Sequence, residues 1–346
     1  MSDSKRFPFV DFLRGVAIFL MLWGHSIQYS CGGQFDFFEN IVFKTIYSFH
    51  MPFFMLISGF LFWFSEQNRG LVELIEYKTK TLLYPILICS VLNFLLSTSI
   101  DSLFRREFNS IIGESSLNSA WFLWSLIACS IALTLTVKVV KNRLLQIIIF
   151  VLGFQIVALF PQSDMNIYMY PYFVLGYLFS RNILNLKKGI HLGGIVSTIS
   201  FVVMMFFFEK KHYIYTSGLH GEKVNFVGFS IDIFRWTIGL LGSISIIYIC
   251  WLLYGFISKA GITKFVENIG KESLAMYLLS ISLLSFWLKK IFDHIFVLLP
   301  CINWNNNILL YNFIITPLIA IAYLIGIFYL IKLLKKIRLY RLIFGR

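Results

Sequence analysis

Long apolar stretches joined by short polar loops are the feature that most limits how this chain folds. A helix that crosses a bilayer needs about 20 mostly apolar residues. Ten stretches approach this length, and no loop between them exceeds about 22 residues, too short for a soluble domain. The stretches are Val10–Tyr29, Ile41–Phe64, Leu82–Ser99, Ala120–Val140, Leu144–Phe160, Ile167–Phe179, Leu192–Phe208, Phe226–Ile257, Leu274–Phe296 and Ile308–Ile331. We therefore expect an all-α, polytopic integral membrane protein of about ten spanning helices, with residues 1–346 forming one domain.

The composition excludes a water-soluble domain of this size. Hydrophobic residues make up 58% of the chain and charged residues only 14%, whereas soluble domains carry roughly a quarter of charged residues. Met1–Lys5 lacks the features of a removable signal, so the first apolar stretch is expected to remain as a helix. The five cysteines include no CxxC pair, which argues against zinc. Cys31 and Cys301 fall on the same predicted side, which leaves a disulfide between them open.

The basic residues are distributed asymmetrically between alternate loops. Of the 30 Lys and Arg residues, Arg235 lies inside a stretch and 21 lie on the side of the N-terminus. The other eight are Lys44, Arg105, Arg106, Lys210, Lys211, Lys223, Lys289 and Lys290. Because cytoplasmic loops are enriched in Lys and Arg, both termini are predicted to be cytoplasmic, in a multi-pass protein of the cytoplasmic (inner) membrane. The net charge of +13 is then a topology signal and an attraction to anionic membrane lipid, and nucleic-acid binding is disfavoured.

The first stretch carries three ionisable residues, Asp11, Arg14 and His25. Such residues are costly inside a membrane and mark a functional site by default. Arg14 and His25 are eleven residues apart, or about three turns and roughly 16 Å of rise, so they share one face of a helix. Asp11 lies one turn before Arg14 and is expected to orient its guanidinium. Arg14 would lie near the cytoplasmic end of this helix and His25 deeper in the membrane. This arrangement suits an anionic ligand that enters from the cytoplasm. The alternatives to a functional site are structural roles. Arg14 would extend its charged end to the membrane surface, and His25 would form a hydrogen bond between helices.

The second stretch contains His50, Pro52, Ser58 and Gly59. Pro52 removes a helical hydrogen bond and is expected to bend the helix. Ser58 and Gly59 permit a neighbouring helix to approach closely. His50 is either a second catalytic group or a polar support. No acidic or cysteine partner lies at ligand spacing, so a metal site is not expected.

Two further charges lie inside the eighth stretch. Asp232 and Arg235 are one helical turn apart, so we expect them to neutralise one another, with a role in gripping a substrate as the alternative.

These motifs resemble those of the acyltransferase-3 family of bacterial membrane acyltransferases, which includes O-acetyltransferases that modify O-antigens, capsules and exopolysaccharides. The family's Arg, ten residues and His are matched by Arg14 and His25. Its His-Met-Pro-x-Phe-Phe stretch leading into Ser-Gly-Phe is matched by residues 50–60. Looser similarities extend to the C-terminal segment 332–345, so the resemblance covers nearly the whole chain.

The resemblance implies transfer of an acyl group, most often acetyl from acetyl-CoA, to a sugar hydroxyl of a lipid-linked or surface glycan. His25 would be the catalytic base and Arg14 would position the donor. An imidazole with a pKa near 6.5 suits proton removal at neutral pH, and a covalent acyl-histidine remains the alternative route.

The chain departs from the family pattern in two places. An Arg-x-x-Arg pattern is replaced by Lys78 and Thr81, with Lys80 between them, so Lys78 and Lys80 are the candidate donor contacts. Lysine binds a phosphate as a point charge, without the bidentate fork of arginine. The family's late histidine is replaced by Ser280.

Two other classes of function compete with the enzyme. A transporter or flippase for a glycan intermediate would line its pathway with the same ionisable residues. A non-catalytic partner of a polysaccharide synthase would keep the fold without turnover. The combination of Arg14, His25 and the segment around Pro52 favours the enzyme.

Overall fold

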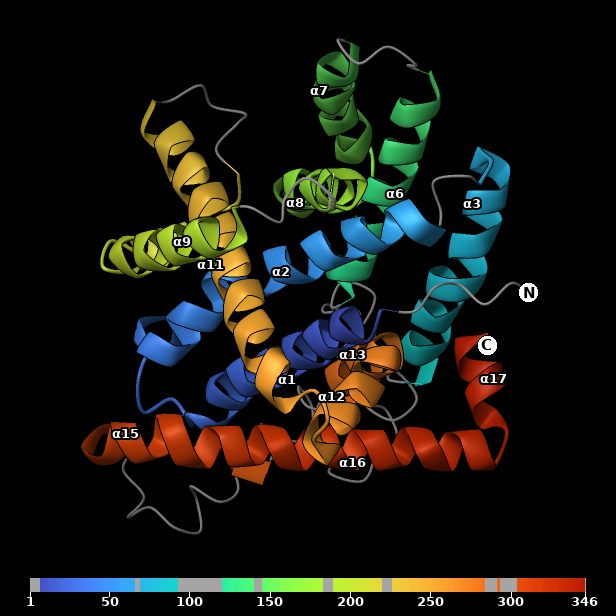
Figure 1. Cartoon of the computed structure of the whole chain (residues 1–346). Coiled ribbons are helices and arrows are strands. Elements are labelled where there is room, and N and C mark those ends of the chain that lie inside the picture. Colours follow the sequence, from blue (N-terminus) through green and yellow to red (C-terminus); the bar gives the residue numbers. More distant parts are fainter. Residues whose placement is uncertain are drawn as a thin grey trace, which may run out of the picture. The chain divides into compact units, whose positions relative to one another are not determined.

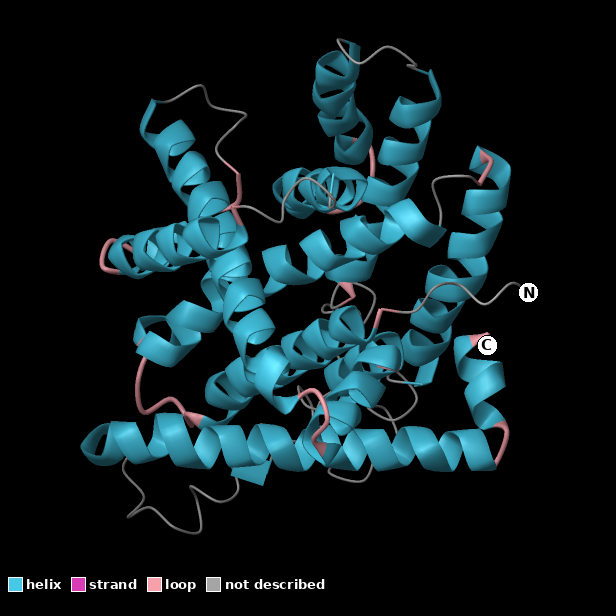
Figure 2. Cartoon of the chain, viewed as in Figure 1, coloured by secondary structure: helices cyan, strands magenta, loops and turns pink. Residues whose placement is uncertain are grey.

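A computed structural model describes residues 7–65, 69–92, 120–139, 145–182, 189–219, 226–283, 291–292 and 304–345. These residues form helices and connecting turns, with no strand among them (Figure 2), which confirms the all-α prediction. The helices of the first half are α1 (Pro8–Ser30), η1 (Phe37–Glu39), α2 (Ile41–Ser65), α3 (Leu71–Lys78), η2 (Thr79–Leu83), α6 (Trp121–Val139), α7 (Leu145–Ala158) and α8 (Ser163–Asn182). Residues 84–92 continue the helix of η2.

The second half is also helical. It contains α9 (Ile190–Met205), η5 (Lys210–His212), α10 (Ile214–Ser217), α11 (Phe226–Ile257), α12 (Gly261–Lys271), α13 (Ser273–Leu283), η7 (Asn305–Asn307), α15 (Ile308–Leu310), η8 (Tyr311–Ile315), α16 (Thr316–Lys336) and α17 (Leu339–Phe344), labelled where space allows in Figure 1.

Within the described residues, four helical stretches are long and apolar enough to cross a membrane. They are Pro8–Ser30, Ile41–Phe64, Phe226–Ile257 and Asn305–Lys336. Residues 121–137 and 190–205 form shorter apolar helices. The expected spans Leu82–Ser99 and Leu274–Phe296 extend into residues outside the described part. The count of ten and the cytoplasmic termini therefore stay predictions.

The chain divides into two compact units. Unit 1 comprises Met1–Ala17, Lys44–Ile75 and Phe122–Lys271. Unit 2 comprises Ile18–Phe43, Glu76–Trp121 and Glu272–Arg346. Each unit is built from segments far apart in the sequence, and α1 contributes its first half to unit 1 and its second half to unit 2.

Glycines set the closest helix contacts of unit 1. A Cβ atom on Gly59 of α2 would lie 1.9 Å from the carbonyl oxygen of Phe173, and one on Gly176 of α8 would lie 2.0 Å from that of Leu56. The two helices thus cross backbone to backbone, which only glycine permits. Helices α9 and α11 also pack side by side (Figure 1).

Polar side chains join the segments of unit 2. Gly32, with φ 59°, follows the last turn of α1 in a left-handed conformation. The Asn40 side chain then accepts hydrogen bonds from the backbone of Val42 and Phe43 and caps the start of α2. It also donates to the Asn312 side chain at 2.7 Å. The turn after α1 is thereby tied to η8.

Candidate functional site

Arg14 lies in the first half of α1, within unit 1. Its Nη1 donates to the Asp11 carboxylate at 3.4 Å, so the spacing of three residues produces the expected pair. The Arg14 side chain is 25% exposed, so it is only partly covered by its neighbours. Helix α12 packs against this turn, because a Cβ on Gly15 would lie 2.2 Å from the Val266 carbonyl oxygen and one on Gly270 would lie 1.8 Å from that of Asp11. The turn that presents Arg14 is therefore fixed by backbone contacts.

His25 lies in the second half of α1, within unit 2, and is half-buried. Its Nδ1 lies 3.1 Å from the Gln28 side-chain oxygen, one turn further along the helix. The imidazole also stacks on the Tyr29 ring, with a centroid distance of 5.6 Å and an angle of 11° between the planes. Gln28 thus contacts the edge of the imidazole and Tyr29 contacts its face, and both residues lie one turn further along the helix.

His50 is buried in α2, with 2% of its surface exposed. Its Nδ1 donates to the carbonyl oxygen of Ile46 at 3.0 Å, since a carbonyl only accepts. The ring also contacts the Tyr47 ring at 4.6 Å between centroids. These contacts suit a polar support, while a second catalytic role stays a prediction.

The two predicted orienting residues of α2 lie on either side of the middle of the helix. Helix α2 continues through Pro52, which provides no backbone N–H for the helix. The Ser58 hydroxyl donates to the carbonyl oxygen of Phe54 at 2.8 Å, one position before the close contact at Gly59. Both residues thus shape the helix that carries His50.

The two lysines predicted to bind the donor have different surroundings within unit 2. Lys78, at the end of α3, has only 6% of its surface exposed. Lys80, in the π-helical turn η2, is exposed and pairs with Glu76 at 2.5 Å. Only Lys80 therefore presents its ammonium group at an exposed surface.

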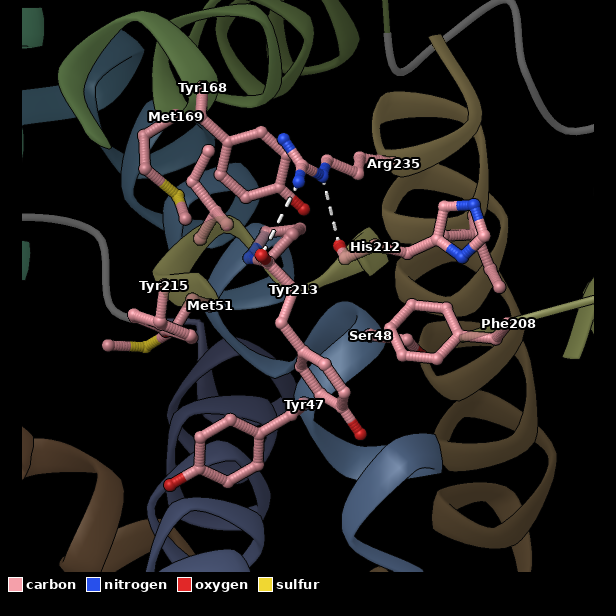
Figure 3. Close-up of a pocket in the computed structure, with 13 residues that line it drawn as sticks. Tyr47, Ser48, Met51, Tyr168, Met169, Phe208, His212, Tyr213, Tyr215 and Arg235 are labelled. Atoms are coloured by element: carbon pink, nitrogen blue, oxygen red, sulfur yellow. Dashed lines mark hydrogen bonds between the residues drawn. The ribbon is translucent and has the colours of Figure 1, made fainter. Parts of the chain in front are cut away.

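A small pocket in unit 1 adjoins the turn of α2 that ends at Pro52, and Pro52 belongs to its lining. Figure 3 shows the pocket. Tyr47, Tyr168, Tyr213 and Tyr215 contribute to its lining, together with Arg235. Its enclosed part has room for about one water molecule. The pocket joins α2, α8 and α11 to the segment Lys210–Gly218, which the sequence alone did not single out.

Arg235 holds that segment in place. It is 1% exposed, and all five of its N–H groups are engaged. Their acceptors are the carbonyl oxygens of Lys211 (2.6 Å), His212 (3.1 Å) and Gly218 (2.6 Å), the Asp232 carboxylate (2.8 Å) and the Ser217 hydroxyl. The expected pair with Asp232 is present. Because no donor remains, Arg235 organises the chain rather than gripping a substrate.

His212 is a second member of this segment. Its Nδ1 accepts the backbone N–H of Glu209 at 2.9 Å. Burial lowers the pKa of His212 to about 4, and the charge of Lys211 acts in the same direction. The imidazole is therefore neutral at pH 7 and serves as a hydrogen-bond acceptor for the turn.

Among the described residues, neither the cysteines nor any group of possible metal ligands forms a further site. Cys89, Cys129 and Cys250 are buried free thiols. The pairing of Cys31 with Cys301 falls outside the described residues, because Cys301 is not among them. In the part of the chain that the structure describes, no three His, Cys, Asp or Glu side chains form a metal-binding group.

The predicted site residues fall into both units. Asp11, Arg14, His50, Pro52 and Ser58 belong to unit 1, whereas His25, Lys78 and Lys80 belong to unit 2. Arg14 and His25 are joined by the continuous helix α1. A single donor site formed by Arg14 and the two lysines stays a prediction.

Comparison with known proteins gives a family over nearly the whole chain. The family model described as "Acyltransferase domain" matches residues 7–331. Two curated relatives are a Nodulation protein NolL of Mesorhizobium japonicum, 29% identical over 182 residues, and one of Sinorhizobium fredii, 29% identical over 185 residues. Each match covers 50% of this chain and 48% of the relative, so the chain spans about half the length of the curated relatives it matches. No solved structure matches.

Proposed function

The chain belongs to the acyltransferase-domain family, and on this premise we propose that it is a membrane O-acyltransferase. The acyl group is acetyl and comes from acetyl-CoA on the cytoplasmic side. The acceptor is a sugar hydroxyl of a lipid-linked or surface glycan. The observation that carries the proposal is the family match over residues 7–331, which includes the Arg14 and His25 of helix α1.

The donor carries negative phosphates, so its site needs accessible cations. Arg14 is partly exposed and held by Asp11, and its fork suits bidentate contact with a phosphate. Lys80 is exposed and contributes a point charge. Lys78 is 6% exposed, which makes it the weakest of the three candidates.

In the proposed transfer step, His25 is the general base. The imidazole removes the proton of the sugar hydroxyl while its oxygen attacks the thioester carbonyl. The C–O ester bond forms, the C–S bond breaks, and the thiolate of coenzyme A leaves and takes up the proton from the imidazolium. In the alternative route, a nitrogen of His25 attacks the thioester first and then passes the acyl group to the hydroxyl.

Replacement of His25 tests the proposal directly. The purified full chain in lipid vesicles receives labelled acetyl-CoA and a membrane extract that contains the native glycan, and ester-linked label on the glycan is measured. We expect His25→Ala to lower transfer by about 10²–10⁴-fold, the usual contribution of a general base. Membrane level and melting temperature serve as folding controls.

The same vesicles, with movement of the glycan across the membrane as a second measurement, separate the enzyme from a transporter. Wild-type transfer that persists in a well-folded His25→Ala protein would remove His25 from the chemistry. Movement of unmodified glycan across the vesicle membrane, without ester formation, would support a transporter instead.

A further inference from the structure

The turn of α1 around His25 places a hydrogen-bond acceptor next to one of the two ring nitrogens. The Gln28 side-chain oxygen lies 3.1 Å from Nδ1 of His25. A carboxamide oxygen accepts hydrogen bonds and cannot donate them, so this contact is a hydrogen bond only when Nδ1 carries the hydrogen. In a neutral imidazole the other nitrogen, Nε2, then holds the lone pair.

We propose that Gln28 is a positioning residue for the transfer reaction, which selects the His25 tautomer with the proton on Nδ1 and so makes Nε2 the base. This inference rests on the proposed function, because it assigns His25 the proton of the acceptor hydroxyl. Tyr29 supports the same arrangement, since its stacked ring, 5.6 Å away, limits rotation of the imidazole out of its plane.

The opposite face of α1 is anchored to other helices of unit 2. At 3.6 residues per turn, Trp23, Ile27 and Ser30 lie about 140–160° around the helix from His25. The Trp23 indole N–H donates to the Thr316 hydroxyl at 2.9 Å. The Tyr311 hydroxyl donates to the Ile27 carbonyl oxygen at 2.9 Å and lies 2.9 Å from the Ser30 hydroxyl.

These anchors set the rotation of α1 about its own axis. Tyr311 is fully buried and belongs to the π-helical turn η8, and Thr316 begins α16 directly after it. π-helical turns occur frequently at functional sites. With its back face bonded to η8 and α16, the second half of α1 directs His25 and Gln28 to the other side. The tautomer is thus selected by Gln28 on a helix whose orientation is fixed independently.

Two substitutions separate the hydrogen bond from the size of the side chain. Gln28→Leu keeps a similar volume but has no acceptor, whereas Gln28→Glu keeps an oxygen at the same reach. Protein labelled with ¹⁵N-histidine in lipid membranes reports the tautomer by nitrogen chemical shift, and the His25→Ala spectrum identifies the His25 signals. We expect the Nδ1–H form in wild type and Gln28→Glu, and its loss in Gln28→Leu.

The kinetic consequence follows from misplacing the base. We expect Gln28→Leu to lower kcat about 10–100-fold, with the KM values for acetyl-CoA and the glycan unchanged. Gln28→Glu should restore most of kcat. A purely structural role would lower the melting temperature and the folded yield without this separation of kcat from KM. Gln28→Asn, which is polar but too short to reach Nδ1, replaces Gln28→Leu if the leucine variant fails to fold.

The outcomes distinguish the inference from the proposed function. An Nε2–H tautomer in wild type, or an unchanged tautomer in Gln28→Leu, overturns the role of Gln28 even where His25→Ala abolishes transfer. A tautomer that changes in Gln28→Leu while transfer stays at the wild-type rate confirms the orientation of the ring and removes His25 as the base.

Discussion

Two arginines within apolar helices follow an aspartate at the same spacing, yet their surroundings give them different capacities. Arg14 pairs with Asp11 at 3.4 Å and is 25% exposed, whereas Arg235 pairs with Asp232 at 2.8 Å and is 1% exposed. Every N–H group of Arg235 already has an acceptor in the chain. Of these two arginines, Arg14 is therefore the candidate for the proposed contact with an anionic donor, because of its exposure and not because of its spacing.

Replacement of Arg14 should weaken donor binding. Arg14→Ala removes charge-assisted contacts to the donor phosphates, which are among the stronger polar interactions. We expect a rise in the Kd of the purified protein for acetyl-CoA of about tenfold or more. Lys211→Ala, on the predicted outer side, is the matched control and should leave the Kd unchanged. An unaltered Kd in the Arg14 variant would contradict the assignment.

Replacement of Arg235 should affect folding instead. Arg235→Met leaves the Asp232 carboxylate and several carbonyl groups buried without their partner, which costs about 3–5 kcal/mol for a broken buried pair. The melting temperature of the purified protein should fall steeply. Lys211→Ala breaks only an exposed pair with Glu209 and should change the melting temperature little. Equal melting of the two variants would disprove the structural role of Arg235.

At the level of helices, glycines decide how closely α2 and α8 pack. Gly59→Ala would place a methyl group 1.9 Å from the Phe173 carbonyl oxygen, so the helices must separate. Overpacking of this kind costs about 1–3 kcal/mol. Gly255→Ala is the control, because nothing lies within 4 Å of its Cβ position. The two melting temperatures should diverge, and a Gly59 variant as stable as the control would show that α2 and α8 do not meet there.

The segment that Arg235 holds should be sensitive to acid. The folded-state pKa of His212 is about 4, below the ordinary value of 6.5. The unfolded chain therefore binds the proton first, and the stability contributed by neutral His212 is present above pH 6.5 and is lost as the pH falls toward 4.

Melting temperatures measured between pH 7.5 and 4 test this expectation. His212→Asn offers an oxygen that can accept the Glu209 N–H but does not titrate, so its melting temperature should fall less over this range. Identical pH dependence in the variant and in wild type would exclude His212 as the source.

At the level of the whole molecule, the charge distribution predicts which side of the membrane each loop occupies. Lys211 precedes α11 and Lys259 follows it, and both residues are exposed. If α11 crosses the membrane, the 21 basic residues on the N-terminal side place Lys259 in the cytoplasm and Lys211 outside.

Single cysteines at these positions, in a chain without its native cysteines, test the topology. A membrane-impermeant thiol reagent added to intact cells should label Lys211→Cys and spare Lys259→Cys, and both should react after lysis. The reverse pattern would invert the predicted orientation, and labelling of both in intact cells would show that α11 does not separate them.

The sequence by itself determined the all-helical fold, the spanning length of four helices and the family. Apolar length and helical spacing are local properties, so Asp11 and Arg14 could be paired, and Arg14 and His25 placed on one helix face, without a structure. Gln28, three residues after His25, was equally visible, but its role needed the geometry of the ring.

Only the tertiary structure decided which distant segments support these residues. Trp23 bonds to Thr316 across 293 positions of sequence, and Asn40 bonds to Asn312 across 272. The carbonyl groups that accept hydrogen bonds from Arg235 belong to Lys211, His212 and Gly218, and nothing in the sequence of this segment predicts that contact. Every residue has a backbone carbonyl group, so the sequence does not show which carbonyl groups accept these hydrogen bonds. The apolar composition of the chain thus predicts helices in a membrane environment. Contacts between segments that are distant in the sequence determine which charged side chains remain exposed.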